Sequence, residues 1–162
     1  MIGLFFGDTD FPKLILKKLK KLKKNYIILD LSRKNIFIKD SKSFRVNIGR
    51  FGSILKLLRD KKCNKVIFAG KIDKPNLTKI KLDMTGIYYL PRIIKAYKKG
   101  DAAILKELVN ILALEKIKVI KSTFFTPEIS LNKGNYTKDK PTKDDLADIK
   151  KGENILKKTN SF

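Results

Sequence analysis

The chain has 162 residues, and its 38 Lys and Arg against 16 Asp and Glu give a formal net charge of +22. This length suits one domain with a short extension. The hydrophobic fraction of 43% is sufficient for a packed core, which excludes a wholly disordered chain. Because the sequence contains no His and one Cys, it has no zinc motif, no Cys-His dyad and no Ser-His-Asp triad.

Two sequence features concern the cellular compartment. The chain has no run of 18 apolar residues, and Met1 leads into a strand-like segment rather than a signal peptide. Cys63 cannot form an internal disulfide, and we interpret it as a structural thiol because no His is present to act as its base. We therefore expect a soluble intracellular protein.

The positive charge is concentrated in the first half of the chain, where residues 1–81 contain 22 cations and 6 anions. Of all the cations, 33 are Lys and only 5 are Arg. Proteins that read nucleic acids favour Arg, and no pattern of base-stacking aromatic side chains accompanies the Lys runs, so we expect no specific nucleic-acid partner. We interpret the charge mainly as a Lys-rich composition that also attracts phosphates or anionic lipid headgroups.

Short apolar runs alternate with helical patterns over the first part of the chain. Residues 2–6 form a continuous apolar run, which is typical of a strand buried on both faces. Further strands are predicted at 26–31, 36–38, 44–48 and 66–69, and amphipathic helices at 13–24 and 51–58. This alternation predicts an α/β fold with a Rossmann-like, mostly parallel sheet flanked by helices.

The middle of the chain is predicted to contain two helices and a last strand. The first helix begins near Leu90, with Pro91 in its first turn, and continues to Lys98. The second helix, at residues 102–115, is apolar over a wide arc and is therefore expected to lie in the core. A short strand follows at residues 117–120.

In the last part of the chain the composition changes. Residues 131–143 are rich in Asn, Gly, Thr, Lys and Pro, as in a linker. A C-terminal helix with a narrow apolar stripe follows, with Thr142 as its N-cap and Asp145 as a capping-box partner. We therefore divide the chain into a Rossmann-like amino-terminal domain, residues 1–125, and a linker with a connecting helix, residues 126–162.

The loop after the first strand is the main candidate for a ligand site. Ligands of parallel sheets bind beyond the carboxyl ends of strands, and this loop contains Gly7, Asp8, Thr9 and Asp10. Gly7 permits a tight turn, Thr9 offers a hydroxyl, and the two carboxylates form a D-x-D pair that can hold Mg²⁺. The alternative is a turn Asp followed by an N-cap of the next helix. Neither a GxGxxG motif nor a Walker-type phosphate loop occurs in the sequence.

Two later loops are weaker candidates for substrate or phosphate binding. Gly70 and Lys71 follow a predicted strand, where glycine permits close approach of the backbone and lysine can meet a phosphate. A plain surface loop over residues 70–75 explains them equally well. Gly100 and Asp101 can contribute to binding at a helix N-terminus, although helix capping is sufficient to explain them.

The predicted helix at residues 13–24 carries Lys at nearly every position outside its apolar stripe. Basic amphipathic helices of this kind can lie on anionic membranes. A solvated Lys face over an ordinary core stripe is the alternative.

Five short motifs follow one another in a fixed order along the chain. They are IGLFFGDTDFP (residues 2–12), GRFGSI (49–54), FAGKIDKP (68–75), LP with KGDAAIL (90–105) and ADI (147–149). In order and spacing these motifs resemble those of the UDP-2,3-diacylglucosamine pyrophosphatases of the LpxI type. The resemblance covers the amino-terminal domain and the linker of that family.

The resemblance implies a hydrolase of lipid A biosynthesis that is cytoplasmic or peripheral to the inner membrane. Such an enzyme uses Mg²⁺ and water to cleave UDP-2,3-diacylglucosamine into UMP and lipid X. Two departures from the family pattern matter. Asp8 and Thr9 replace glycines of the family's first loop, and the chain stops at Phe162, before the second domain that carries the family's catalytic Asp. No catalytic residue is therefore transferred to this chain, and we expect no turnover without that domain.

Two hypotheses follow. In the first, the chain is the nucleotide-sugar-facing half of such an enzyme, with a UDP-sugar lipid as substrate and a separate or missing catalytic domain as partner. In the second, it is a stand-alone basic α/β module that binds anionic ligands or a membrane surface. Whether the chain forms a homodimer is left open.

Overall fold

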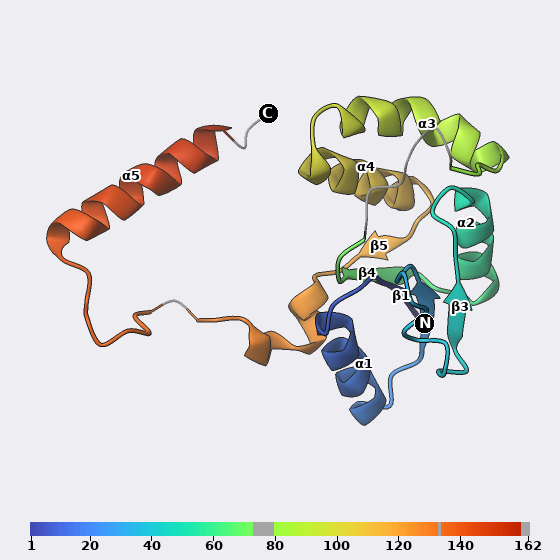
Figure 1. The fold of residues 1–162 in the computed structure, drawn as a ribbon, viewed down its shortest axis with the longest axis horizontal. Coiled ribbons are helices and arrows are strands. Elements are labelled where there is room, and N and C mark those ends of the chain that lie inside the picture. Colours follow the sequence, from blue (N-terminus) through green and yellow to red (C-terminus); the bar gives the residue numbers. More distant parts are fainter. Residues whose placement is uncertain (73–79, 133, 160–162) are drawn as a thin grey trace. The chain divides into compact units, whose positions relative to one another are not determined.

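The computed structural model describes residues 1–72, 80–132 and 134–159 (Figure 1). These residues form two compact units, Met1–Ser130 and Leu131–Phe162. No helix within the described ranges is both long and apolar enough to cross a membrane. The elements, in chain order, are β1 (Ile2–Phe6), α1 (Phe11–Lys21), β2 (Tyr26–Asp30), β3 (Ser43–Arg45), α2 (Phe51–Asp60), β4 (Lys65–Ala69), α3 (Met84–Tyr97), α4 (Asp101–Leu114), β5 (Lys118–Val119), the 3₁₀ turns η1 (Ser122–Phe125) and η2 (Pro127–Ile129), and α5 (Lys143–Thr159).

The strands of the first unit form one parallel sheet in the order β3-β2-β1-β4-β5. This arrangement confirms the predicted α/β fold with a parallel sheet, linker and C-terminal helix. The chain moves outward from β1 to β3 on one side and from β4 to β5 on the other, so the strand order reverses between β1 and β4. In open parallel sheets, ligands bind in the crevice at this reversal, beyond the carboxyl ends of the strands.

Helices cover both faces of the sheet (Figure 1). Leu4 and Phe6 of β1 pack with Ile15 and Leu19 of α1 on one face. Phe5 points to the opposite face and belongs to the core formed with α2, α3 and α4. Because both faces are covered, a strand in this sheet has no solvated side, which explains why β1 and β2 read as continuous apolar runs.

The strand predicted at residues 36–38 is wrong, because this segment forms a turn anchored at the end of β2. The buried carboxylate of Asp30 accepts hydrogen bonds from the backbone N–H and the hydroxyl of Ser32, at 2.9 and 2.6 Å, and from the N–H of Phe37 at 3.4 Å. Phe37 is thereby buried against Phe6, whereas Ile38 is 72% exposed. One anchored aromatic ring, rather than a strand, accounts for the apolar pattern.

α3 begins earlier than predicted, at Met84 rather than near Leu90, and Pro91 lies inside the helix. Asp83 is its N-cap, and the Asp83 carboxylate accepts a hydrogen bond from the backbone N–H of Gly86 at 2.8 Å. This cap stabilises the start of α3 and offsets part of the cost of Pro91, which lies eight residues after Asp83.

The prediction that the helix at residues 102–115 lies in the core is wrong for its first half. Ile111 and Leu112 of α4 are fully enclosed, but Leu105 is 48% exposed. Its amino-terminal half therefore borders an open hollow at the carboxyl edge of the sheet.

The capping box predicted for the last helix is confirmed. The hydroxyl of Thr142 accepts a hydrogen bond from the N–H of Asp145 at 3.2 Å, and the Asp145 carboxylate accepts one from the N–H of Thr142 at 2.8 Å. No residue of α5 is buried. Local capping, rather than packing, is therefore what defines the start of α5.

Candidate ligand-binding site

The loops after β1 and β4, which are separate candidates in the sequence, form one structure at the carboxyl edge of the sheet. The backbone N–H of Asp8 donates to the carbonyl of Lys71 at 2.8 Å, and the N–H of Lys71 donates to the carbonyl of Asp8 at 2.7 Å. This bridge lies where the strand order reverses. Of the predicted 70–75 loop, Asp73, Lys74 and Pro75 lie outside the described residues.

Two glycines allow these loops to approach each other. A Cβ atom on Gly7 would lie 2.1 Å from the carbonyl oxygen of Lys71, and one on Gly70 would lie 2.5 Å from that of Asp8. Gly70 also has a φ angle of +86°, which other residues rarely adopt. The backbone at Gly70 thus does come close to another group, as expected, but that group is the backbone of the loop after β1.

Local partners hold the two carboxylates of the first loop. The Asp8 carboxylate accepts from the backbone N–H of Arg33 at 3.2 and 3.4 Å. Asp10 pairs with Lys13 at 2.8 Å, and this hydrogen bond lowers the pKa of Asp10. Asp10 occupies the N-cap position of α1 but makes no capping hydrogen bond, while Thr9 has a φ angle of +103°. Asp8 therefore lies in the turn and Asp10 at the N-cap position, as the alternative interpretation expected, but the Asp10 side chain does not cap the helix.

These contacts do not prepare Asp8 and Asp10 to hold Mg²⁺ by themselves. Mg²⁺ prefers an octahedron of oxygen ligands, whereas both carboxylates already face hydrogen-bond donors. In the part of the chain that the structure describes, no three His, Cys, Asp or Glu side chains cluster in a way that could hold a metal ion. The described residues alone therefore do not fit the Mg²⁺ implied by the sequence resemblance.

An apolar hollow of about 450 Å³ opens beside the bridged loops, between the ends of β1 and β4 and the first half of α4. Its lining includes Leu105, and Gly70 and Asp101 also border it. Gly100, with a φ angle of +105°, forms the turn that places Asp101 as the first residue of α4, where a negative charge suits the helix dipole. Gly70 and Asp101, which the sequence places in two separate loops, therefore border the same hollow.

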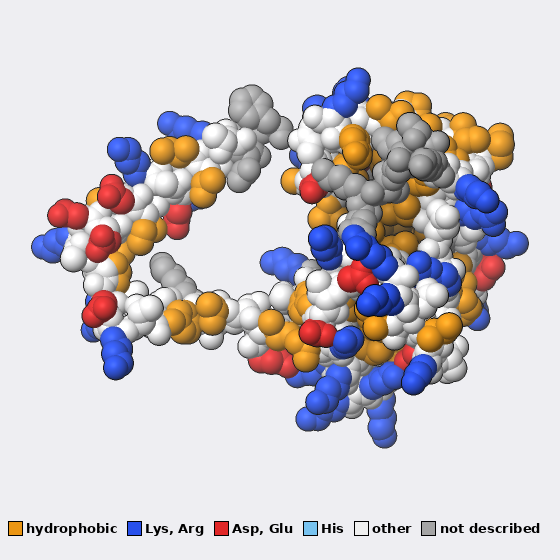
Figure 2. Space-filling model, in the orientation of Figure 1, with side chains coloured by type: hydrophobic (Ala, Val, Ile, Leu, Met, Phe, Trp, Pro, Cys, Tyr) orange, Lys and Arg blue, Asp and Glu red, His pale blue; other side chains and the backbone are white. Residues whose placement is uncertain are grey.

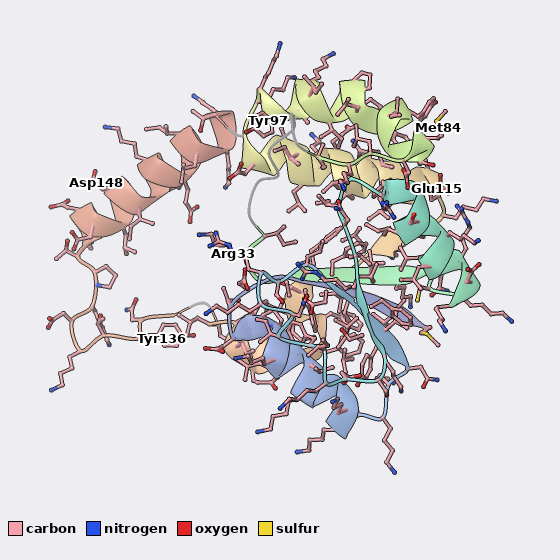
Figure 3. All side chains as sticks on the ribbon, turned by 45° about the vertical axis from the view of Figure 1, so that its right-hand side comes forward. Arg33, Met84, Tyr97, Glu115, Tyr136 and Asp148 are labelled. Atoms are coloured by element: carbon pink, nitrogen blue, oxygen red, sulfur yellow. The ribbon has the colours of Figure 1, made fainter. Side chains whose placement is uncertain are left out.

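A second, more polar hollow of about 440 Å³ adjoins the first, and Leu31, Ile48 and Ile72 line both. It lies beyond the ends of β2 and β3 and is lined by Arg33 and Arg45. Figure 3 shows Arg33 at this end of the sheet, with its side chain projecting away from the strands. The two hollows together give the carboxyl edge one cationic and one apolar compartment.

Arg45 is tied to the same anchor that shapes the turn after β2. Its guanidinium donates a hydrogen bond to the carbonyl of Ser32 and lies 3.7 Å from the buried carboxylate of Asp30. The sequence analysis did not single out Arg33 or Arg45 as site residues. The available signal was their place just after predicted strands or within them, in a chain where Arg is rare.

The glycines of the GRFGSI motif bring the start of α2 against the start of α3. A Cβ atom on Gly49 would lie 2.4 Å from the carbonyl oxygen of Lys81. The Asp83 carboxylate accepts hydrogen bonds from the backbone N–H groups of Gly52 at 3.2 Å and Ser53 at 3.0 Å, besides that of Gly86. Burial opposes ionisation of Asp83, but these N–H donors outweigh it and lower its pKa.

Cys63 lies in the core on the α2 side of the sheet. Burial raises the pKa of its thiol, which disfavours the reactive thiolate. The structure thus agrees with a structural thiol away from the ligand edge.

Residues 1–129 match the sequence model of the LpxI N-terminal domain. A curated relative, the UDP-2,3-diacylglucosamine pyrophosphatase LpxI of Caulobacter vibrioides (strain ATCC 19089 / CIP 103742 / CB 15), is 32% identical to this chain over 112 residues. The matched segment covers 69% of this chain and 40% of the relative. The chain therefore spans less than half the length of the curated relative that it matches.

Proposed function

The chain belongs to the LpxI family, and from this premise we propose that it provides the substrate-binding half of a UDP-2,3-diacylglucosamine pyrophosphatase. The complete reaction would convert UDP-2,3-diacylglucosamine and water into lipid X and UMP, during lipid A biosynthesis in the cytoplasm. The chemical step would need a positioned water and charge stabilisation that the described residues do not supply. This chain would therefore bind the substrate, while a further domain or a separate chain completes the active site.

The observation that supports this proposal is the pair of adjoining hollows at the carboxyl edge of the sheet. Guanidinium groups such as those of Arg33 and Arg45 match the planar, bidentate geometry of phosphate oxygens. The neighbouring apolar hollow suits the less polar groups that flank the diphosphate. A substrate in which a diphosphate links a nucleoside to an acylated sugar needs both compartments side by side.

The family motifs contribute to this arrangement mainly through the backbone. Gly7 and Gly70 allow the loops beyond β1 and β4 to be bridged, and Gly100 allows the turn that directs Asp101 to the rim. The family resemblance of these segments is thus consistent with a shared shape of the binding edge. The direct ligand contacts are proposed for Arg33, Arg45 and Lys71.

Substitution Arg33→Gln tests the cationic compartment. We expect this variant to bind UMP about tenfold more weakly than the unmodified chain, because one charge-assisted contact to phosphate is lost. Arg59→Gln is the matched control, since Arg59 lies on α2 and pairs with Glu115 at 2.9 Å, away from both hollows. Isothermal titration calorimetry with UMP measures both variants, and equal affinities would contradict the proposed site.

The absence of turnover is tested separately. Purified chain incubated with UDP-2,3-diacylglucosamine and Mg²⁺ is expected to release no UMP above the uncatalysed rate. Release of UMP in proportion to the protein concentration would show that the chain carries its own catalytic groups. That result would leave the binding edge intact and contradict only the proposed division of labour.

A further inference from the structure

α3 carries an exposed apolar stripe. Met84, Ile87, Tyr88 and Pro91 are spaced by three or four residues, so they lie on one face of the helix, and Ile94 extends that face by another turn. Met84 is 81% exposed and Tyr88 is 73% exposed. Figure 2 shows hydrophobic side chains gathered over α3 on the visible face of the first unit. We call these five side chains the α3 stripe.

The orientation of this helix is set by its other face. Tyr89 and Ala96 of α3 are buried, and Tyr89 packs edge-on against Phe51 of α2 at a ring distance of 6.0 Å. α3 is therefore docked on the domain by one side, and the α3 stripe faces solvent. Large apolar side chains that are exposed together on one helix face commonly mark an interaction surface.

The charged side chains of α3 itself and of the residues directly after it are all positive. α3 contains no Asp or Glu, and the carboxylate of Asp83 at its start is satisfied by three backbone N–H groups. Two carboxylates near the helix are paired with arginines: Glu107 of α4 with Arg92, and Glu115 with Arg59. Exposed lysines lie at the C-terminal end of the stripe: Lys95, Lys98 and Lys99. The surface is thus apolar along its first turns and cationic at its end.

We propose that the exposed face of α3 docks on an anionic lipid bilayer, with the α3 stripe at the interface and the terminal lysines against lipid phosphates. Apolar burial together with Lys is the combination that holds amphipathic helices on membranes, and Tyr suits the boundary between water and lipid. A second copy of the chain would supply lysines rather than carboxylates to the same face, so charge favours the bilayer. This inference does not depend on the substrate proposed above.

The contact differs from the one suggested by sequence alone, which was the basic helix near the amino terminus. α1 exposes many lysines but only the isolated apolar side chains Leu14 and Leu22 near them. Lysines without an apolar stripe attract anionic surfaces only through charge that salt screens. α3 combines both contributions, and the experiment therefore compares the two helices.

Co-sedimentation with sucrose-loaded vesicles of phosphatidylcholine, with or without phosphatidylglycerol, measures the proposed contact. The unmodified chain should bind the anionic vesicles and retain part of this binding at high salt. The variant Met84→Gln/Ile87→Gln/Tyr88→Gln should bind about tenfold more weakly. The control Lys17→Gln/Lys21→Gln/Lys24→Gln, on α1 and the turn that follows it, should change binding by no more than about threefold. Thermal unfolding of each variant verifies that the fold is retained.

A fluorescence probe gives an independent readout, since the sequence contains no Trp. With brominated lipids, the fluorescence of a Tyr88→Trp chain should be quenched, and that of a Leu14→Trp chain should not. Equal vesicle binding of the α3 variant and the unmodified chain, or quenching only at position 14, would overturn the proposal. A homodimer that the α3 variant abolishes, without any vesicle binding, would assign the stripe to a second copy and overturn it too.

Discussion

At the scale of single residues, Asp83 connects two helices that lie far apart in the sequence. Its carboxylate caps α3 through Gly86 and also accepts from the N–H groups of Gly52 and Ser53 in the first turn of α2. Helix N-termini carry partial positive charge, so one carboxylate serves both ends electrostatically. The GRFGSI motif and the start of α3 therefore form one unit around this side chain.

This connection predicts how Asp83 affects stability at different pH. The pKa of Asp83 is lower in the folded chain than its ordinary value, so its ionised form stabilises the fold above the unfolded pKa of about 4. That contribution is lost as the pH falls through the lowered folded pKa. Asp83→Asn keeps a capping oxygen but cannot ionise, and we expect it to be less stable near neutral pH and to show a shallower loss of stability in acid.

Asp83→Ala is the companion variant, because it removes the capping oxygen as well as the charge. We expect it to lower the free energy of unfolding by about 2 kcal/mol near neutral pH, more than Asp83→Asn does. Urea unfolding at a series of pH values measures both effects. If the unmodified chain and Asp83→Asn lose stability in parallel as the pH falls, the Asp83 charge does not hold the two helix starts together.

At the scale of elements, buried strands were predicted more reliably than helix starts. β1 and β2 are enclosed on both faces, so their apolar runs are sufficient to predict where these strands lie. The start of α3 depends on a capping residue outside the apolar pattern, and the turn after β2 depends on a buried carboxylate that reaches Phe37. Hydrogen bonds of this kind link residues whose contact cannot be predicted from the spacing of apolar residues in the sequence.

Pro91 allows a direct test of an unusual position within α3. A proline inside a helix removes one backbone hydrogen bond and crowds the preceding turn, while its reduced freedom in the unfolded chain offsets part of this cost. Pro91→Ala should therefore raise the free energy of unfolding by about 2 kcal/mol. Thermal or urea denaturation measures the change.

The matched control for that prediction is Pro127→Ala. Pro127 is exposed and stands in the first turn of η2, where the missing N–H costs no intrahelical hydrogen bond. This substitution should leave the free energy of unfolding unchanged or lower it by less than about 1 kcal/mol. A destabilised Pro91→Ala variant would indicate that the proline fits α3 without strain.

At the scale of the whole molecule, sequence reasoning located the candidate loops but not their assembly. Gly7, Gly70 and Gly100 each follow a recognisable element, and parallel topology predicts that the first two lie at one edge. Arg33 and Arg45 belong to the site because β2 and β3 are neighbours in the sheet and an anchored turn lies between them. The order of the strands in the sheet cannot be predicted from local sequence patterns. A binding site made of several loops can therefore be recognised only once the strand order of the sheet is known.

The net charge of +22 provides the last prediction, which concerns the stability of the chain as a whole. The chain has 38 cations against 16 anions, so folding brings an excess of like charges closer together and self-repulsion opposes the compact state. Raising sodium chloride from low to moderate concentration shortens the Debye length from about 30 Å to about 10 Å and should raise the free energy of unfolding by about 1 kcal/mol. A chain stabilised mainly by exposed ion pairs would instead lose stability, because salt weakens those pairs.

The variant Lys17→Gln/Lys21→Gln/Lys24→Gln serves as the control for this effect. It removes three exposed positive charges from α1 and the turn that follows it without touching the core, so it should be more stable than the unmodified chain at low salt. Its stability should also rise less steeply with salt, and the two chains should converge at high salt, where repulsion is screened in both. Parallel salt curves for the two chains would show that salt acts through something other than self-repulsion, such as chloride binding at the cationic hollow.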